Sequence, residues 1–117
     1  MRRPSILLLV ALGALALPAA ASAMTKVYVF ANKGRALHMT QKRVIDYSHR
    51  ALRRRFTIRR HGMLTFCGTR TFRTGQCDVL VSTKRTGRWC GNTYVRALDR
   101  DHVRVRIVAG RKGCGEF

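Results

Sequence analysis

Residues 102–109, with the sequence HVRVRIVA, decide the fold because their side chains alternate strictly in character. One set of alternating positions, here called a parity, is apolar, and it consists of Val103, Val105, Ile107 and Ala109. The other parity consists of His102, Arg104, Arg106 and Val108. A period of two predicts a β-strand with one face against a core and the other in water. We expect the water-facing side to be cationic.

The same half of the chain, from Met63 to Gly115, predicts an antiparallel sheet of four strands separated by Gly, Asp and Thr-rich turns. The expected strands are Leu64–Phe72, Cys77–Thr83, Thr93–Leu98 and His102–Ala109. In the first strand, Leu64 and Phe66 fall on the opposite parity from Cys67, which requires either a bulge at Gly68 or a different face. We expect the large aromatic residues of this region to lie in the core or at its rim, namely Phe66, Phe72, Trp89 and Tyr94.

A helix is predicted over Ala36–Arg55, which contains no Gly or Pro. Its apolar residues recur at helical spacing, and they are Leu37, Val44, Ile45, Leu52 and, just beyond, Phe56. Upstream, within residues 24–35, Lys26–Phe30 has the composition of a short edge strand or of a tethered arm. The predicted fold class is therefore α+β, with one helix packed on a four-stranded antiparallel meander sheet, and residues 36–117 form a single domain.

Four cysteines predict two disulfides in an exported chain of this size. Three connectivities are possible, and we favour Cys67–Cys77 with Cys90–Cys114, because the first pair flanks a predicted hairpin turn. The cysteines are separated by nine, twelve and 23 residues, so the short Cys-x-x-Cys spacing of structural zinc sites and redox motifs is absent. We expect no metal and no cofactor.

The N-terminus predicts a secretory signal peptide over residues 1–23. Arg2 and Arg3 precede the apolar run Ile6–Leu17, and the small residues Ala21–Ala23 follow. The run is shorter than the ~20 residues that span a bilayer, so we expect a secreted protein with no transmembrane span after cleavage.

The chain is strongly basic, with 24 Lys and Arg against five Asp and Glu among 117 residues. Cleavage after Ala23 would leave 22 basic and five acidic residues, a formal charge of +17. Such a charge favours association with polyanions and does not choose between nucleic acid, anionic lipid and acidic envelope polymer. The high positive charge has two explanations of equal weight, a binding role and an arginine-rich composition imposed by a GC-rich genome.

The helix, the strand order and the Cys-Gly and Cys-x-Val patterns resemble small exported disulfide-bonded proteins of GC-rich bacteria. The architecture of Ala36–Cys114 is also distantly similar to the cystatin-like fold. The Gln-x-Val-x-Gly hairpin of cystatins is absent, so this resemblance implies no inhibitor activity.

Three classes of function follow from these residues. The leading hypothesis is a non-enzymatic secreted domain that binds anionic envelope polymer or lipid, through the sheet face and the helix C-terminus. Its candidate anion-binding residues are Arg53, Arg54, Arg55, Arg59, Arg60, Arg104 and Arg106. The alternatives are a small ribonuclease that uses His102 and a second histidine, and a protein–protein interaction or inhibitor module. No catalytic motif is present, and the scarce carboxylates give no catalytic pair, so we assign no catalytic residue.

Overall fold

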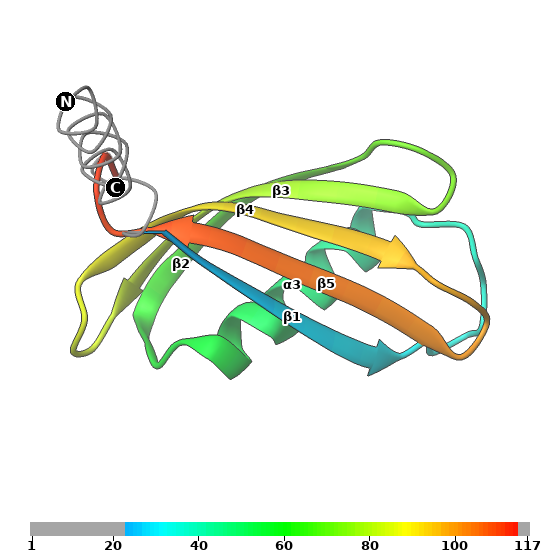
Figure 1. Ribbon diagram of the computed structural model, residues 1–117, viewed down its shortest axis with the longest axis horizontal. Helices are drawn as coiled ribbons and strands as arrows, with labels where there is room; N and C mark the ends of the chain where they lie inside the picture. The colour runs from blue at the N-terminus through cyan, green and yellow to red at the C-terminus, as the bar shows by residue number, and fades with distance from the viewer. Residues whose placement is uncertain (1–22, 115–117) are drawn as a thin grey trace, which may run out of the picture.

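The computed structural model describes residues 23–114, so the predicted signal peptide lies outside the described residues apart from Ala23. Within them the chain forms one helix and five strands. In chain order these are β1 (Ala23–Ala31), α3 (Gln41–Arg55), β2 (Ile58–Thr69), β3 (Thr74–Thr83), β4 (Arg88–Ala97) and β5 (His102–Gly110). The α+β class is confirmed (Figure 1).

The sheet has five antiparallel strands in the order β1-β5-β4-β3-β2, not the four that we predicted. The additional strand is β1, which pairs with β5 from Ala23 opposite Gly110 to Ala31 opposite His102. Of the two interpretations of Lys26–Phe30, the edge strand is confirmed and the tethered arm is wrong, although β1 is longer than that range. Alternation did not decide between them, because both sides of the strand carry apolar residues, Val27 and Val29 on one and Tyr28 and Phe30 on the other.

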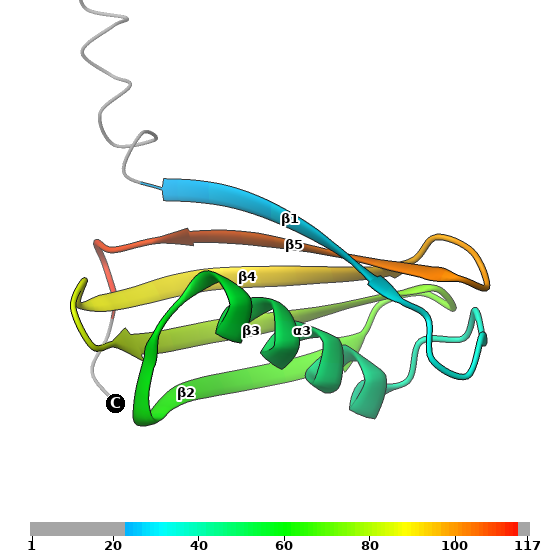
Figure 2. The same cartoon turned by 90° about the horizontal axis from the view of Figure 1, so that it is seen from below.

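The helix α3 lies across one face of the sheet, and the described residues place no helix on the other (Figure 2). It begins five residues later than predicted, at Gln41, because the backbone N–H of Met39 donates to Phe72 in the β2–β3 turn. The Thr40 hydroxyl caps the helix by accepting from the backbone N–H of Arg43. The buried helix residues are Val44, Tyr47, Ser48, Ala51 and Leu52.

The core fills the space between α3 and the sheet. The alternation in β5 is confirmed, because its apolar parity is almost fully buried there. Cys77, Val81, Thr93 and Val95 contribute from β3 and β4. Every buried hydrophobic side chain of the described part lies between Phe30 and Ala109, so residues 24–117 retain this core.

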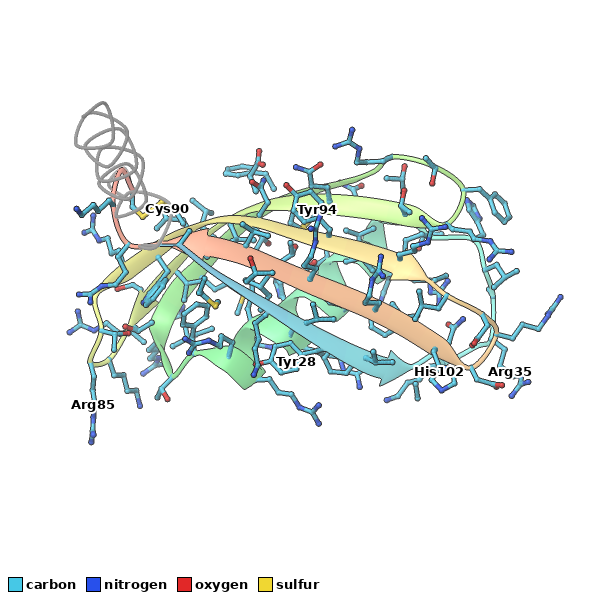
Figure 3. All side chains as sticks on the ribbon, viewed as in Figure 1. Tyr28, Arg35, Arg85, Cys90, Tyr94 and His102 are labelled. Atoms are coloured by element: carbon cyan, nitrogen blue, oxygen red, sulfur yellow. A yellow bond between two sulfur atoms is a disulfide. The ribbon has the colours of Figure 1, made fainter. Side chains whose placement is uncertain are left out.

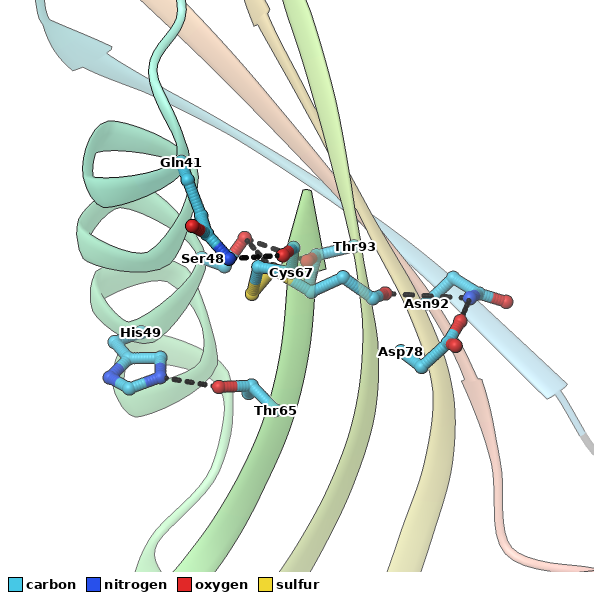
Figure 4. Close-up of a disulfide and its surroundings, with 9 residues drawn as sticks. Gln41, Ser48, His49, Thr65, Cys67, Asp78, Asn92 and Thr93 are labelled. Atoms are coloured by element: carbon cyan, nitrogen blue, oxygen red, sulfur yellow. Dashed lines mark hydrogen bonds between the residues drawn. A yellow bond between two sulfur atoms is a disulfide. The ribbon is translucent and has the colours of Figure 1, made fainter. Parts of the chain in front are cut away.

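Both predicted disulfides are confirmed. Cys67 and Cys77 are direct cross-strand partners of β2 and β3, with Cα atoms 4.0 Å apart, and their bridge lies on the helix side of the sheet. There the Sγ atom of Cys77 is 3.2 Å from Ser48 Oγ, which hydrogen-bonds to the hydroxyl of Thr93 (Figure 4). Cys90–Cys114 ties the end of the chain to β4. Two disulfides indicate an oxidising environment outside the cytoplasm.

The register corrects the face assigned to β2. The cross-strand pair Cys67–Cys77 is followed directly by the pair Gly68–Gln76, so no bulge occurs at Gly68. The irregularity lies between Ile58 and Met63 instead. Leu64 and Phe66 therefore lie on the face away from the helix, where Phe66 is 68% exposed. The prediction that Phe66 and Phe72 belong to the core or its rim was wrong, because Phe72 lies in the exposed β2–β3 turn.

Candidate anion-binding face of the sheet

The face of the sheet away from α3, here called the open face, carries three neighbouring arginines on β4 and β5. Arg104 and Arg106 occupy the exposed parity of β5, as the alternation predicted. Arg96 of β4 is the direct cross-strand partner of Arg104. Like charges placed directly opposite each other destabilise a sheet, because their side chains stand side by side. An anion bound between them would remove that cost.

The arginines border a hollow of about 220 Å³. Its wall residues include Arg70, Thr74, Tyr94, Arg96, Arg104 and Arg106. The guanidinium of Arg106 lies over the ring of its cross-strand partner Tyr94, with its carbon 4.7 Å from the ring centroid. This contact favours one orientation of a flexible side chain. Tyr94 lies near the middle of the sheet (Figure 3). At the edge of the hollow, the side chain of Arg70 donates a hydrogen bond to the side chain of Gln76.

Carboxylates on the described part of the chain do not neutralise this cluster. The described ion pairs are Arg35–Asp101, Lys42–Asp46 and His102–Asp99, and none includes Arg96, Arg104 or Arg106. Asp78 also lies on the open face, where it accepts a hydrogen bond from the amide of Asn92 at 2.6 Å and forms no ion pair with these arginines. Three arginines against this one carboxylate leave the region around them with a net positive charge.

The other predicted arginines lie elsewhere. Arg53, Arg54 and Arg55 form the last turn of α3, in the layer behind the sheet. The guanidinium of Arg54 packs 5.4 Å from the Phe30 ring centroid, and that of Arg55 packs 5.0 Å from the ring of Phe56. Arg59 and Arg60 are exposed at the start of β2. The predicted set is thus divided between separate surfaces.

Sequence reasoning did not identify Arg70 and Arg96 as members of the site. Arg96 has the alternating position of an exposed strand residue, and its position opposite Arg104 follows from the β4–β5 register. Arg70 reaches the hollow from beyond the end of β2, across the β2–β3 turn. The hairpin predicted from Thr93–Leu98 and His102–Ala109 already places Arg96 opposite Arg104 when the ends of its strands are paired, whereas the place of Arg70 could not be obtained from spacing along the chain.

A second basic hollow, of about 470 Å³, lies beside α3, but its charged groups are partly engaged. Asp46 lines it and pairs with Lys42. Arg43 donates to the backbone oxygens of Ala36 and His38, so it holds the loop before the helix. Burial, together with the positive charge of Arg53, lowers the pKa of His49 from its ordinary value. These contacts favour a structural role for this surface.

His102, the candidate acid–base residue, lies at the end of the sheet near Arg35 (Figure 3). Its Nδ1 atom is 3.0 Å from Asp99 Oδ1, so the ring is oriented by a carboxylate. The backbone N–H of Asp101, chiefly, and the contacts with His102 lower the pKa of Asp99.

The remaining histidines take separate positions. His38 stacks on Phe72 with centroids 4.7 Å apart, and His49 hydrogen-bonds to Thr65 on the opposite side of the sheet from the arginines. His61 is exposed in β2. No contact between described residues joins two of these imidazoles, so His102 stands apart from the other histidines.

Comparison with known proteins found no matching family model, no matching curated protein and no matching solved structure. Among residues 23–114, no group of His, Cys, Asp or Glu side chains could hold a metal ion. The same part of the chain contains no helix long and apolar enough to cross a membrane.

Proposed function

We propose that the protein is a non-enzymatic secreted domain that binds anionic cell-envelope material through the open face. The observation that carries the proposal is the direct opposition of Arg96 and Arg104, with Arg106 beside them and no carboxylate paired to them within residues 23–114. A surface that concentrates like charge is unfavourable by itself and favourable against an anionic partner. The site thus has the character of a binding surface.

The compartment supports this partner class. The basic start and apolar run of residues 1–17 have the features of a secretory signal, and the disulfides require oxidising conditions. A protein in that compartment meets anionic lipids and acidic envelope polymers. Both offer the phosphate or carboxylate groups that guanidinium groups bind with paired hydrogen bonds.

The open face, rather than total charge, is expected to control retention on an anionic matrix such as phosphocellulose. Arg104→Gln/Arg106→Gln should lower the apparent affinity at low salt about thirtyfold, taking about 1 kcal/mol for each arginine near an anionic surface. Arg53→Gln/Arg54→Gln removes the same charge from the far layer and is the matched control. It should change the affinity several-fold less.

The retention of each variant is measured as the salt concentration at which it elutes from phosphocellulose in a salt gradient. Exposed charges are screened, so retention of the unaltered protein should fall as salt rises. Equal losses in the two variants would show that net charge alone governs binding and would refute a role for the open face. Retention that does not depend on salt would refute anion binding itself.

A small ribonuclease is the second candidate function. The observation that favours it is the hydrogen bond between Nδ1 of His102 and the Asp99 carboxylate, which orients the imidazole ring. The exposed ring and nearby arginines fit a phosphodiester substrate. The test is the integrity of RNA incubated with the oxidised protein across the pH range in which imidazole titrates. Intact RNA throughout that range excludes this candidate.

A further inference from the structure

The open face also carries exposed apolar side chains on both sides of its arginines. On β1, Val27 and Val29 are 48% and 51% exposed. On β2, Leu64 and Phe66 are 43% and 68% exposed. Exposed apolar groups gathered on one surface mark a site of interaction with another molecule or with a membrane.

The strand register places these apolar groups relative to the arginines. Val27 is the direct partner of Arg106, and Val29 is the direct partner of Arg104. At the other margin, Leu64 is opposite the half-buried Leu80 of β3. Phe66 is opposite Asp78, whose carboxylate binds the amide of Asn92. The face is therefore apolar on β1, cationic on β5 and β4, mostly polar on β3 and apolar again on β2.

We propose that this face docks on the surface of an anionic lipid bilayer. The proposal rests on the anion-binding function above and narrows its partner to lipid. The arginines would bind headgroup phosphates, with their stems along the apolar boundary and their guanidinium groups at the level of the phosphates. Phe66 and Leu64 at one margin, and Val27 and Val29 at the other, would enter the boundary between headgroups and acyl chains.

Lipid fits this face better than the other possible occupants. A hydrated sugar or phosphate polymer would satisfy the arginines but would leave Phe66 and the valines in water, with no gain from their burial. A second copy of the chain would bring a cluster of arginines against an identical cluster, which costs electrostatic energy. A bilayer with anionic headgroups offers negative charge and an apolar layer within one side-chain length of each other.

The oxidised chain of residues 24–117 is tested on vesicles of phosphatidylcholine, with or without phosphatidylglycerol. Phe66→Ser is expected to lower partitioning onto the anionic vesicles about tenfold, since a phenyl ring no longer leaves water. Phe72→Ser is the matched control, because Phe72 is 65% exposed but lies in the β2–β3 turn. It should leave partitioning unchanged, and neither change should alter retention on phosphocellulose.

Depth of insertion gives a readout that does not depend on affinity. Brominated acyl chains should quench the fluorescence of the Phe66→Trp protein. The Phe72→Trp protein should show only the quenching of the unaltered protein, whose single tryptophan, Trp89, packs against Phe56. The substitution Val27→Thr/Val29→Thr tests the other margin while it keeps β-branched residues in the strand. It should weaken partitioning in the same direction as Phe66→Ser.

The outcomes separate the two proposals. Equal partitioning of the Phe66 and Phe72 variants, with no quenching at position 66, would overturn lipid insertion even if salt-dependent retention on phosphocellulose persisted. In that case the partner is a soluble or polymeric anion. Binding to neither anionic vesicles nor phosphocellulose would overturn the proposed function as well.

Discussion

Replacing Gly91 with alanine is expected to lower the free energy of unfolding by about 3 kcal/mol or more. Gly91 of β4 is the cross-strand partner of Ala109 in β5. A Cβ atom at this position would lie 2.0 Å from the carbonyl oxygen of Val108 and 2.8 Å from Cα of Ala109. Both contacts are with backbone, so no side-chain rotation relieves them, and the β4–β5 pair would have to separate.

Gly68→Ala is the matched control for this substitution. Gly68 also lies in a strand, β2, and a Cβ atom there meets nothing within 4 Å. Alanine should be neutral or should stabilise by a few tenths of a kcal/mol, since it restricts the unfolded chain. Denaturant unfolding of both variants measures the difference. A Gly91→Ala protein as stable as the Gly68→Ala protein would contradict the close β4–β5 register.

Removal of the Cys67–Cys77 bridge is expected to cost about 3 kcal/mol of stability. The bridge joins β2, an edge strand of the sheet, to β3, and it closes a loop with a sequence separation of ten. Loop-closure entropy of a segment this short accounts for most of that value. A second contribution comes from packing, because Cys77 is fully buried against Ser48.

Two variants separate these contributions. Cys67→Ala/Cys77→Val removes the covalent link but keeps a side chain of similar volume in the core. Cys67→Ala/Cys77→Ala removes both, and it should be less stable by about another 1 kcal/mol. The comparison is made by denaturant unfolding of the oxidised proteins. A loss of unfolding free energy below about 0.5 kcal/mol in either variant would show that the bridge does not restrict the conformational freedom of the unfolded chain.

The strongest local patterns in the sequence predicted the structure correctly. The alternation of residues 102–109 identified which side of β5 is buried, and the spacing around a hairpin turn identified the Cys67–Cys77 pair. The helix was predicted with its end at Arg55, but its start was not, because a tertiary hydrogen bond from Met39 keeps that residue outside the helix.

The remaining features depend on contacts between distant segments. In β2 the apolar parity faces water, while Thr65 and Cys67 face the helix, so hydrophobicity alone indicated the wrong face. In the candidate site, Arg96 and Arg104 are neighbours across one hairpin, whereas Arg70 comes from a distant turn and Arg53 lies on the other layer.

The open face, and not the helix, is expected to lie against the membrane in the bound protein. The oxidised chain, bound to anionic bicelles that carry a gadolinium-chelating lipid, is observed by amide relaxation in NMR. Relaxation enhancement falls steeply with distance from the lipid headgroups. We expect the strongest enhancement across β4 and β5, at the amides near Arg96, Arg104 and Arg106, and weaker enhancement in α3. Stronger enhancement along α3, near Arg50 and Arg53, would contradict it.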